Sequence, residues 1–501
     1  MSSSPVIVGV AQFTQHGKPE HPLDPMGLMV KASQEALDDA CAARLRAFID
    51  CVYVINLFQW SYRDAPGELS ARLGLKPRQA FYLPVGGNTP QLTVNRAARD
   101  LAAGRCRAVL MTGAEAIYSL RRALKGEMVL DWPASVPPDR IDGEDTSGFD
   151  RLEALYDLFF PTSMYPLFET SLRASSGRSP DDHRMHMGKA FERLSRIASQ
   201  NPFAWSKKAL SALEIATPTP DNRYIGYPYT MTMNANVNVD QSAAVVMTTE
   251  DAARSFGIPE EKWVYPTGGA EFNDIWYVTR RPCLHESPAI RNASRMALKQ
   301  AGLALGDIHF FDIYSCFPSA FEIAGREIGI PEDDPRDLSV TGGLPFFGGP
   351  GNNYTMHAIA GVVDRIRKDR SQKAMVTANG WYLTKHAVGI YAASPSAQPW
   401  RDRDDSAVQQ AINAGALPEP VERASGTLTV EAYVIRHDKT GNAQKGTVIG
   451  RLDDGSRTLA DIDAGPEELL RMENVELVGR QGDVRYDETA GRNLVRFDIA
   501  L

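Results

Sequence analysis

The sequence predicts an α/β protein with two similar halves, followed by a small antiparallel β-domain. Up to about residue 400, short apolar or β-branched runs alternate with helical patterns, which is typical of mostly parallel sheets covered on both faces. Segments 86–116 and 348–381 share one plan: a Gly-Gly pair, Pro and Asn, a helix of about four turns and a buried strand. Between residues 425 and 500, alternating runs separated by turn residues indicate antiparallel strands.

The strands of the two halves are expected at runs rich in Val, Ile, Phe and Tyr. Helical patterns or turn residues separate these runs. We expect strands at 5–13, 52–58, 80–85, 108–116 and 242–249 in the first half, and at 309–317, 338–344, 373–381 and 388–394 in the second.

The first half, residues 1–250, is interrupted at about 117–240 by a polar, aromatic and helical insertion. An inserted segment of this length between two strands is more often a subdomain that covers a substrate than a simple connection. The second half takes residues 251–400, and residues 420–501 form a small barrel or sandwich, with His437 expected on its surface. If the halves stack around a pseudo-twofold axis, the amino-termini of both helices face one central region, where amide N–H groups favour an anion or oxyanion.

Composition limits the function classes. Hydrophobic residues make up 43% of the 501 residues, and the formal net charge is -8. The sequence has no tract of twenty apolar residues, no basic-plus-apolar leader and no run of Lys or Arg. We therefore expect a cytoplasmic protein with no membrane span and no nucleic-acid partner.

Cysteine and histidine patterns argue against a metal site. The five cysteines show no Cys-x-x-Cys spacing, which fits a reducing compartment better than a disulfide framework. His183 and His186 are three residues apart and could share a helix face. Two ligands are too few for a zinc site, so we expect them on an ordinary polar helix surface and predict no metal.

Four segments together resemble the thiolase superfamily, in particular the sterol-carrier-protein-type thiolases and thiolase-like proteins with an additional carboxy-terminal domain. The resemblance covers about residues 5–395. It implies a duplicated five-layer αβαβα fold, here followed by an OB-like barrel. The segments are NVNVDQSAAVVM (236–247), AARDLAAGRCRAVLMTGAE (97–115), TGGLPFFGGPGNN (341–353) and DIYSCFPSAFE (312–322).

The resemblance also implies a function. Its members include acetyl-CoA acetyltransferases of lipid metabolism, which use coenzyme A as a substrate moiety and need no further cofactor. We therefore expect acyl-CoA or CoA as the partner molecule. Thiolases usually pair through the strand before the nucleophile helix, here 80–85, but the extra barrel could compete for that edge, so a homodimer and a monomer both stay open.

The catalytic residues of thiolases are missing from the matching positions. Thiolases form an acyl-cysteine, with a neighbouring His and a second Cys. Here the nucleophile's position falls on Gly87, the histidine's on Gly349 and the second cysteine's near Ala378. Tyr314 replaces a further family His, and Cys316 is expected to be a small buried hydrophobe. Ordinary thiolase activity is therefore predicted to be absent.

Three hypotheses explain a thiolase-like sequence without the thiolase catalytic residues. Some relatives without the cysteine are aldolases that cleave 3-hydroxyacyl-CoA with tyrosines, and they work with an OB-fold partner. In this C–C lyase hypothesis the catalytic candidates are Tyr314, Tyr382 and His386, with Lys385 or His386 lowering a tyrosine pKa. Packing under the central helices is the alternative for Tyr314, and a place on the outer rim is the alternative for Lys385 and His386.

The second explanation is a non-catalytic acyl-CoA-binding or assembly subunit, and the third is a displaced nucleophile. Cys106 is the nearest thiol in the sequence, but it lies at the far end of the helix, roughly 25 Å away, which excludes it. His357 either faces the centre or is a core residue. In every case the expected substrate-binding residues are Gly87, Asn88, Gly348, Gly349, Asn352 and Asn379.

Overall fold

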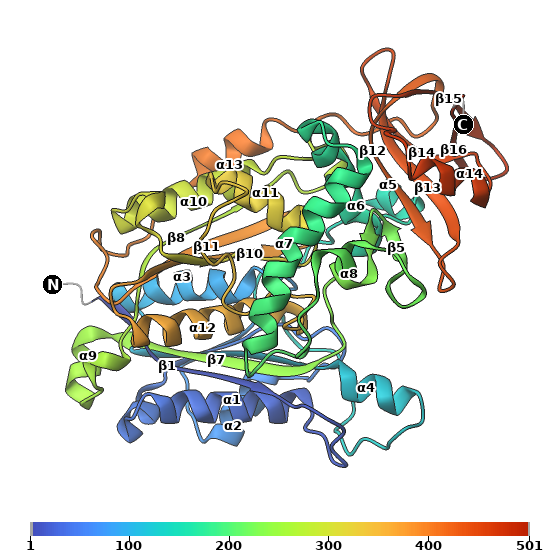
Figure 1. The fold of residues 1–501 in the computed structure, drawn as a ribbon. Helices are drawn as coiled ribbons and strands as arrows, with labels where there is room; N and C mark the ends of the chain where they lie inside the picture. Colours follow the sequence, from blue (N-terminus) through green and yellow to red (C-terminus); the bar gives the residue numbers. More distant parts are fainter. Residues whose placement is uncertain (1–3, 499–501) are drawn as a thin grey trace.

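The computed structural model describes residues 4–498, so residues 1–3 of the first predicted unit and 499–501 of the last lie outside the described residues. Five layers stack on one another: outer helices, a sheet, two central helices, a second sheet and further outer helices (Figure 1). The fold is therefore the duplicated αβαβα arrangement that the sequence predicts, and a separate β-barrel follows it.

The first sheet has the strand order β1-β7-β4-β2-β3. β7 is antiparallel to both β1 and β4, whereas β2 is parallel to both β4 and β3. Its central strands are buried along nearly their whole length, which explains their continuous apolar runs. The bounds are β1 Pro5–Thr14, β2 Cys51–Val54, β3 Gln79–Tyr82, β4 Ala108–Ala116 and β7 Asp240–Thr249.

The second sheet has the order β8-β11-β10-β9 and repeats the plan of the first. An antiparallel pair, β8 with β11, corresponds to β1 with β7, and β10 and β9 correspond to β4 and β2. This shared order supports the internal duplication. The bounds are β8 Tyr265–Asn273, β9 Phe310–Asp312, β10 Lys373–Gly380 and β11 Lys385–Ala392.

The strand expected at 338–344 is not formed, and this prediction is wrong. The buried Asp312 carboxylate takes hydrogen bonds from the Ser339 hydroxyl (2.8 Å), the Val340 amide (2.9 Å) and the Thr341 amide (3.1 Å). The backbone of this segment therefore wraps around a carboxylate group, and it cannot continue along the edge of the sheet.

β8 is a strand that the sequence analysis missed. Its two glycines weaken the strand pattern, because glycine has low strand propensity. A Cβ atom at Gly268 would overlap the carbonyl oxygen of Ala297 in the outer helix, so glycine is needed for close packing of the helix on the sheet.

Helices fill the remaining three layers. α3 and α12 lie between the two sheets, α1 and α2 cover the first sheet, and α10 and α11 cover the second (Figure 1). The bounds are α1 Pro25–Asp39, α2 Ala65–Leu73, α3 Thr89–Ala102, α9 Glu250–Phe256, α10 Pro288–Ala301, α11 Pro318–Ile328, α12 Tyr354–Lys368 and α13 Ser406–Asn413.

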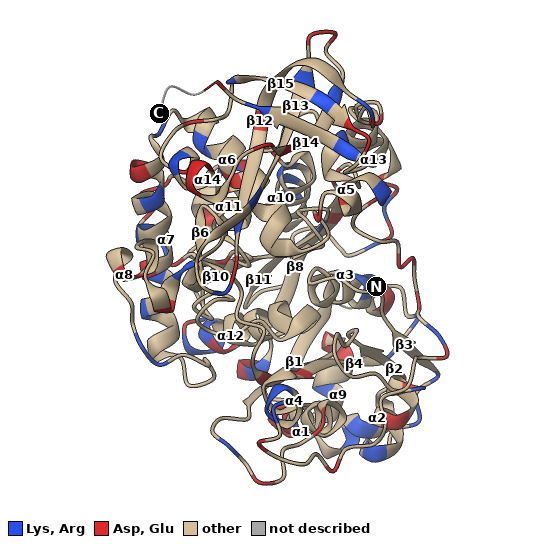
Figure 2. Cartoon of the chain, turned by 90° about the vertical axis from the view of Figure 1, so that its right-hand side faces the viewer, with Lys and Arg blue, Asp and Glu red and all other residues tan. Residues whose placement is uncertain are grey.

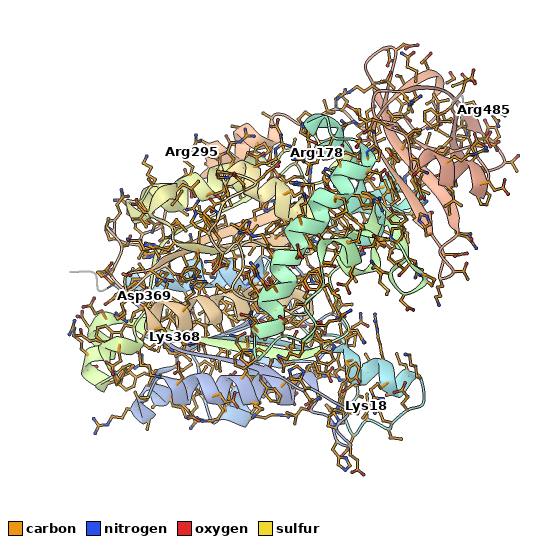
Figure 3. The ribbon with its side chains drawn as sticks, in the orientation of Figure 1. Lys18, Arg178, Arg295, Lys368, Asp369 and Arg485 are labelled. Carbon is orange, nitrogen blue, oxygen red and sulfur yellow. The ribbon has the colours of Figure 1, made fainter. Side chains whose placement is uncertain are left out.

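The chain between β4 and β7 contains the helices α4 to α8, joined by long irregular segments such as 125–150. α6 packs against the barrel strand β12, and Arg178 lies between α6 and α7 (Figure 3). The side chain of His183 in α7 is only 1% exposed and that of His186 is 23% exposed, so the expected exposed position of His183 is wrong. The bounds are α4 Ile117–Leu124, α5 Arg151–Leu155, α6 Pro161–Ser176, α7 Pro180–Gln200, α8 Ala212–Ala216, β5 Tyr224–Tyr227 and β6 Tyr229–Thr230.

The carboxy-terminal β-domain is a closed barrel of five strands. The barrel closes because β12 pairs with both β13 and β15, and β5 adds to β12 from outside. His437 has a side chain that is 1% exposed and lies 2.7 Å from Glu473, so its expected surface position is wrong. The bounds are β12 Ser425–His437, β13 Ala443–Leu452, β14 Arg457–Ile462, α14 Pro466–Met472, β15 Gln481–Asp487 and β16 Arg492–Arg496.

The Tyr82 end of the β3 edge is covered by the segment that follows α4, whereas Gln79 and Ala80 at its start are exposed. The Asp142 amide donates to the Tyr82 carbonyl (2.7 Å), and the Tyr82 amide donates to the Asp142 carboxylate (2.9 Å). The segment takes the place of a neighbouring strand at this edge. The barrel lies away from this edge and packs against α6: in Figure 2, β3 lies at the lower right and the barrel strands lie at the top.

Charged residues are distributed over all layers. Figure 2 shows Lys and Arg interspersed with Asp and Glu on the helices, the loops and the barrel. Within residues 4–498, no helix combines the length and the apolar character that crossing a membrane requires.

Candidate functional site

The two glycine turns meet at the centre of the fold. Gly86 and Gly87 precede α3, and Gly348 and Gly349 precede the short turn that leads into α12. The Gly86 amide donates to Asn352 Oδ1 (2.8 Å), and Thr355 Oγ1 donates to the Gly87 carbonyl (3.2 Å). The amino-terminal ends of both helices therefore converge, as their shared sequence plan predicts.

The Tyr314 phenol fills the space that a side chain at residue 87 would need. A Cβ atom built on Gly87 would overlap the Tyr314 hydroxyl oxygen and lie 2.5 Å from the Asn379 carbonyl oxygen. Tyr314 follows β9, and its ring packs edge-on against Tyr354 with centroids 5.5 Å apart. The nucleophile's position is thus occupied by a hydroxyl group from the other half of the fold.

The hydroxyl group of Tyr314 is protonated and unpaired. Burial, with a smaller contribution from the neighbouring Cys316, raises the pKa of Tyr314 well above its usual value. Within the described part of the chain, the hydroxyl has no hydrogen-bond partner, and the amides of Gly87 and Asn88 donate to no acceptor. These buried groups are therefore hydrogen-bond donors that have no acceptor within the described residues.

Asn379 and Cys316 lie beside this phenol. Asn379 Nδ2 donates to the Tyr165 hydroxyl (2.8 Å) and lies 3.8 Å from Cys316 Sγ, while Asn379 Oδ1 is buried without a partner in residues 4–498. Burial raises the pKa of Cys316 to about 12, so its thiol is neutral near pH 7 and behaves as the expected small hydrophobe. The sequence analysis missed Tyr165, because it comes from α6 in the insertion.

Lys385 reaches the other side of the same turn. Its ammonium group donates to the Val85 carbonyl and lies 2.9 Å from the position that a Cβ atom would take at Gly86. Burial lowers the pKa of Lys385 to about 8, and the nearby Asp145 opposes this shift. Asn88 Oδ1, which also faces Gly86, is buried without a partner among the described residues.

The structure brings neither His386 nor Tyr382 to the turns. Side chains alternate along β11, so His386 points away from Lys385 and lies 3.2 Å from Asp274 Oδ2, on the outer face of the second sheet. The Tyr382 hydroxyl donates to the Phe159 carbonyl (2.6 Å), which engages its proton. Tyr314 is therefore the one residue of the predicted catalytic set that lies at Gly87.

Gly349 differs from Gly87 in the space around it. A Cβ atom at Gly349 would meet Leu344 at 3.4 Å and Ala235 at 3.6 Å, which are ordinary contacts. Its amide is already used, because it donates to the Asn236 carbonyl (2.8 Å). Gly348 has φ +115° and a tight contact with Gln241, so it shapes the turn.

Asn352 connects the second glycine turn to the first half of the fold by two hydrogen bonds. Glu115 lies next to Gly351. Asn352 Nδ2 donates to the Asn56 carbonyl (3.0 Å) while its Oδ1 holds the Gly86 amide. Glu115 Oε1 accepts from the Phe58 amide (2.6 Å), and a Cβ atom at Gly351 would overlap the same oxygen. Burial raises the pKa of Glu115 to about 8, although the backbone hydrogen bonds oppose this shift. The sequence analysis missed Glu115, because it looks like part of a continuous buried strand.

The other residues considered in the sequence lie in the core. His357 is fully buried, with Nδ1 3.1 Å from Gln12 Oε1, and burial lowers its pKa to about 3. Cys106 is buried beyond the far end of α3. Neither residue has the environment of a nucleophile or a general base near neutral pH.

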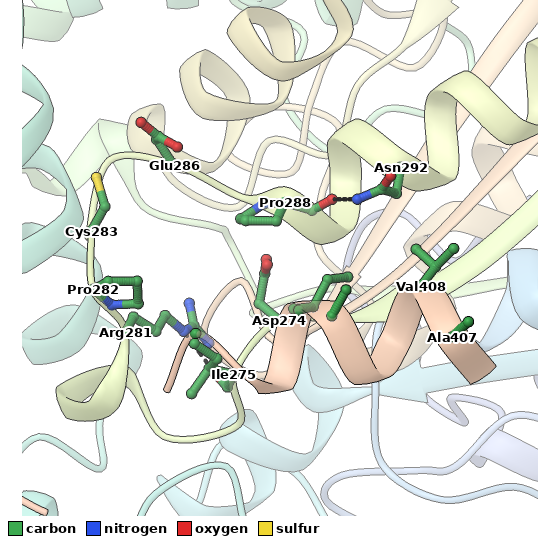
Figure 4. A pocket seen from close by; sticks show the side chains of 13 residues that line it. Asp274, Ile275, Arg281, Pro282, Cys283, Glu286, Pro288, Asn292, Ala407 and Val408 are labelled. Atoms are coloured by element: carbon green, nitrogen blue, oxygen red, sulfur yellow. Dashed lines mark hydrogen bonds between the residues drawn. The ribbon is translucent and has the colours of Figure 1, made fainter. Parts of the chain in front are cut away.

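A separate cavity of about 510 Å³ lies on the outer side of the second sheet (Figure 4). Val408 and Ile412 of α13 form one wall, and Ile275 and Cys283 come from the connection between β8 and α10. Asp274, which neighbours His386, also lines it. None of the glycine-turn residues lines this cavity.

The duplicated α/β halves and their converging glycine turns define a protein of the thiolase-like class. Residues 407–489 match the family described as "Thiolase-like protein type 1 additional C-terminal domain". The chain is 33% identical to the monomeric SCP2-thiolase-like protein type 1 from Mycobacterium smegmatis, over 99% of both chains and with a TM-score of 0.85. The chain therefore belongs to the SCP2-thiolase-like proteins of type 1, which confirms the resemblance and the predicted fold.

More distant structures share the fold alone. Human mitochondrial 3-ketoacyl-CoA thiolase is 16% identical over 78% of this chain and 98% of its own, with a TM-score of 0.55. The Ltp2-ChsH2(DUF35) aldolase is 18% identical over 78% of this chain and 97% of its own, with a TM-score of 0.58. A comparison with functionally curated proteins gives no match.

Proposed function

We propose that this protein binds an acyl-CoA thioester at the paired glycine turns and carries out no acyl-cysteine chemistry. One observation carries the proposal: the Tyr314 hydroxyl occupies the place of a side chain at Gly87, while the amides of Gly87 and Asn88 have no acceptor within the described residues. Those amides suit a thioester carbonyl oxygen or another electron-rich group. The neutral Cys316 thiol does not replace a nucleophile at residue 87.

The protein is further proposed to act as a monomer. The Tyr82 end of the β3 edge is already paired with the chain around Asp142, which shortens the edge that a thiolase dimer would use for strand pairing. The Mycobacterium smegmatis relative is described as monomeric, which agrees with this proposal. Acyltransferase activity and a role in lipid metabolism rest on the family alone and are not part of the proposal.

The purified protein is expected to bind acyl-CoA without thiolytic turnover. Titration calorimetry should give heat with acetyl-CoA or a longer acyl-CoA, whereas acetoacetyl-CoA should not be cleaved when CoA is added. Iodoacetamide treatment should leave binding unchanged, and so should Cys316→Ser, because the thiol group of Cys316 is neutral and buried.

Two results would contradict this proposal separately. Cleavage of acetoacetyl-CoA that is lost on blocking a thiol would show acyl-cysteine chemistry. The absence of heat with every acyl-CoA tested would remove the binding site.

A second candidate function is retro-aldol cleavage of a 3-hydroxyacyl-CoA, and the unpaired Tyr314 phenol favours it. In this reaction the 3-hydroxyl loses its proton, the C2–C3 bond breaks and C3 leaves as an aldehyde or ketone. The electron pair forms a thioester enolate, which takes a proton at C2. A neutral phenol is suited to donate that proton, and Lys385, with a pKa of about 8, is partly neutral and able to accept one near that pH.

Tyr314→Phe is expected to lower the rate of this cleavage by at least about 100-fold, because general acid catalysis typically contributes that much or more. Release of an aldehyde or ketone from 3-hydroxyacyl-CoA substrates measures the rate. Tyr382→Phe is the matched control and should keep the wild-type rate, since its hydroxyl is bound to the Phe159 carbonyl. Equal rates for wild type and Tyr314→Phe, or no product from either, would exclude this function and leave the binding proposal untouched.

A further inference from the structure

A second group of polar side chains lies among α6, α7 and α11, apart from the glycine turns. Glu169, His183 and Glu322 each place one donor atom so that all three atoms lie within 4.8 Å of one another. We propose that these three residues bind a divalent first-row transition-metal ion. This site is independent of the thioester proposal and involves none of its residues.

Two carboxylate side chains of this cluster are buried. The side chains of Glu169 and Glu322 are 0% and 9% exposed, so two carboxylates lie close together with little water. A divalent cation neutralises both carboxylates at once, which removes the cost of two like charges in a low-dielectric environment.

One carboxylate oxygen of the cluster has no hydrogen-bond partner among the described residues. Glu322 Oε1 is buried and has no hydrogen-bond partner in residues 4–498. His183 Nε2 lies 2.6 Å from Glu169 Oε1, so an imidazole nitrogen and a carboxylate oxygen meet in the same buried cluster. Leaving a buried carboxylate oxygen unpaired is costly, and coordination to a metal ion would satisfy it.

Neighbouring side chains contact the outer oxygens of both glutamates and hold the carboxylates in position. In metal sites, such contacts orient the residues that bind the ion. The Tyr229 hydroxyl donates to Glu169 Oε2 (2.6 Å) and leaves Oε1 for the cluster. His186 Nε2 lies 3.3 Å from Glu322 Oε2, the oxygen opposite the unpaired one. Glu332 lies 3.8 Å from His186 Nδ1 and is paired with Arg178 at 2.6 Å, which closes the outer rim.

The ligand set selects the class of ion. One imidazole and two carboxylates suit Zn²⁺, Fe²⁺ or Mn²⁺, whereas Ca²⁺ and Mg²⁺ prefer oxygen ligands alone. The ion would join α6, α7 and α11, and α11 begins two residues after Cys316.

The test is zinc binding by the full-length protein after removal of metal with a chelator. Calorimetry and elemental analysis should give one Zn²⁺ per chain, and binding should raise the Tm. The double variant His183→Asn/Glu322→Gln should bind at least 100-fold more weakly, and His186→Ala about 10- to 100-fold more weakly.

His437→Asn is the matched control and should bind zinc like wild type. His437 also forms a buried pair with a carboxylate, at 2.7 Å from Glu473, but within the described residues no third donor joins them. Unchanged zinc affinity in the double variant, or no zinc bound by wild type, would overturn the proposal.

Anomalous diffraction at the zinc edge from wild-type crystals gives an answer even if the variants unfold. The expected peak lies between Glu169, His183 and Glu322. A peak only at the partly exposed donors Cys283, His285 and Glu286 would overturn the proposal.

Discussion

Gly87→Ala is expected to lower the free energy of unfolding by about 3 kcal/mol, whereas Gly349→Ala should change it by less than about 1 kcal/mol. At residue 87 the new methyl group meets the Tyr314 hydroxyl and, at 2.5 Å, the backbone carbonyl of Asn379, which cannot rotate away. At residue 349 the nearest atom is 3.4 Å away. Urea denaturation followed by tryptophan fluorescence measures both.

The double variant Gly87→Ala/Tyr314→Phe separates the two contacts. Removing the hydroxyl should recover part of the lost stability, but the Asn379 carbonyl remains in place, so recovery should be incomplete. Equal denaturation midpoints for Gly87→Ala and Gly349→Ala would contradict the packing at the first turn.

Glu115→Gln is expected to make the protein more stable at pH 8 and to flatten the dependence of stability on pH. Burial raises the pKa of Glu115 from 4.5 to about 8, so the folded state holds a proton that the unfolded state has lost. The stability that this group contributes is fully present below pH 4.5 and is lost as the pH rises through about 8. The loss is at most about 1.4 kcal/mol per pH unit in that window.

Denaturation of wild type and Glu115→Gln at several pH values between 5 and 8.5 measures this effect. Other buried acids contribute equally to both proteins, so the difference between the two slopes isolates Glu115. Glu261→Gln, at an exposed position, is the control and should follow wild type. Parallel curves for wild type and Glu115→Gln would contradict the raised pKa.

At the first glycine turn, the glycine at residue 87 and the tyrosine at residue 314 are physically linked. Glycine at residue 87 makes room for the Tyr314 phenol, and the phenol in turn leaves no room for a thiol side chain there. A single Gly87→Cys change therefore does not rebuild a thiolase nucleophile. The same coupling does not exist at Gly349, where the missing histidine leaves ordinary space.

Some features of the site follow from local sequence, and others do not. The sequence predicts a strand at 388–394 and leaves Lys385 and His386 before it, whereas β11 begins at Lys385 and therefore turns these two neighbours to opposite faces. Only the packing of the sheets shows that Lys385 faces the turn and His386 faces Asp274. The same holds for Tyr382, whose hydroxyl is bound to the Phe159 carbonyl.

The cluster in α6, α7 and α11 shows the same limit. The spacing of His183 and His186 puts both on one helix, but it cannot show that two glutamates from other helices join them. Likewise, the pairing of β5 with the barrel strand β12 joins segments about 200 residues apart. Local patterns carry no information about such long-range contacts.

By itself, the sequence determined the α/β class, most strands of both halves, the β-domain and the two glycine turns. It could do so because hydrophobic periodicity, turn residues and a repeated motif can all be read from short segments of the chain. The tertiary structure alone decided that β8 completes the second sheet and that Tyr314 occupies the space beside Gly87. These outcomes depend on atoms that meet across more than 100 residues of chain, where shape and volume, and not the local pattern, determine what fits.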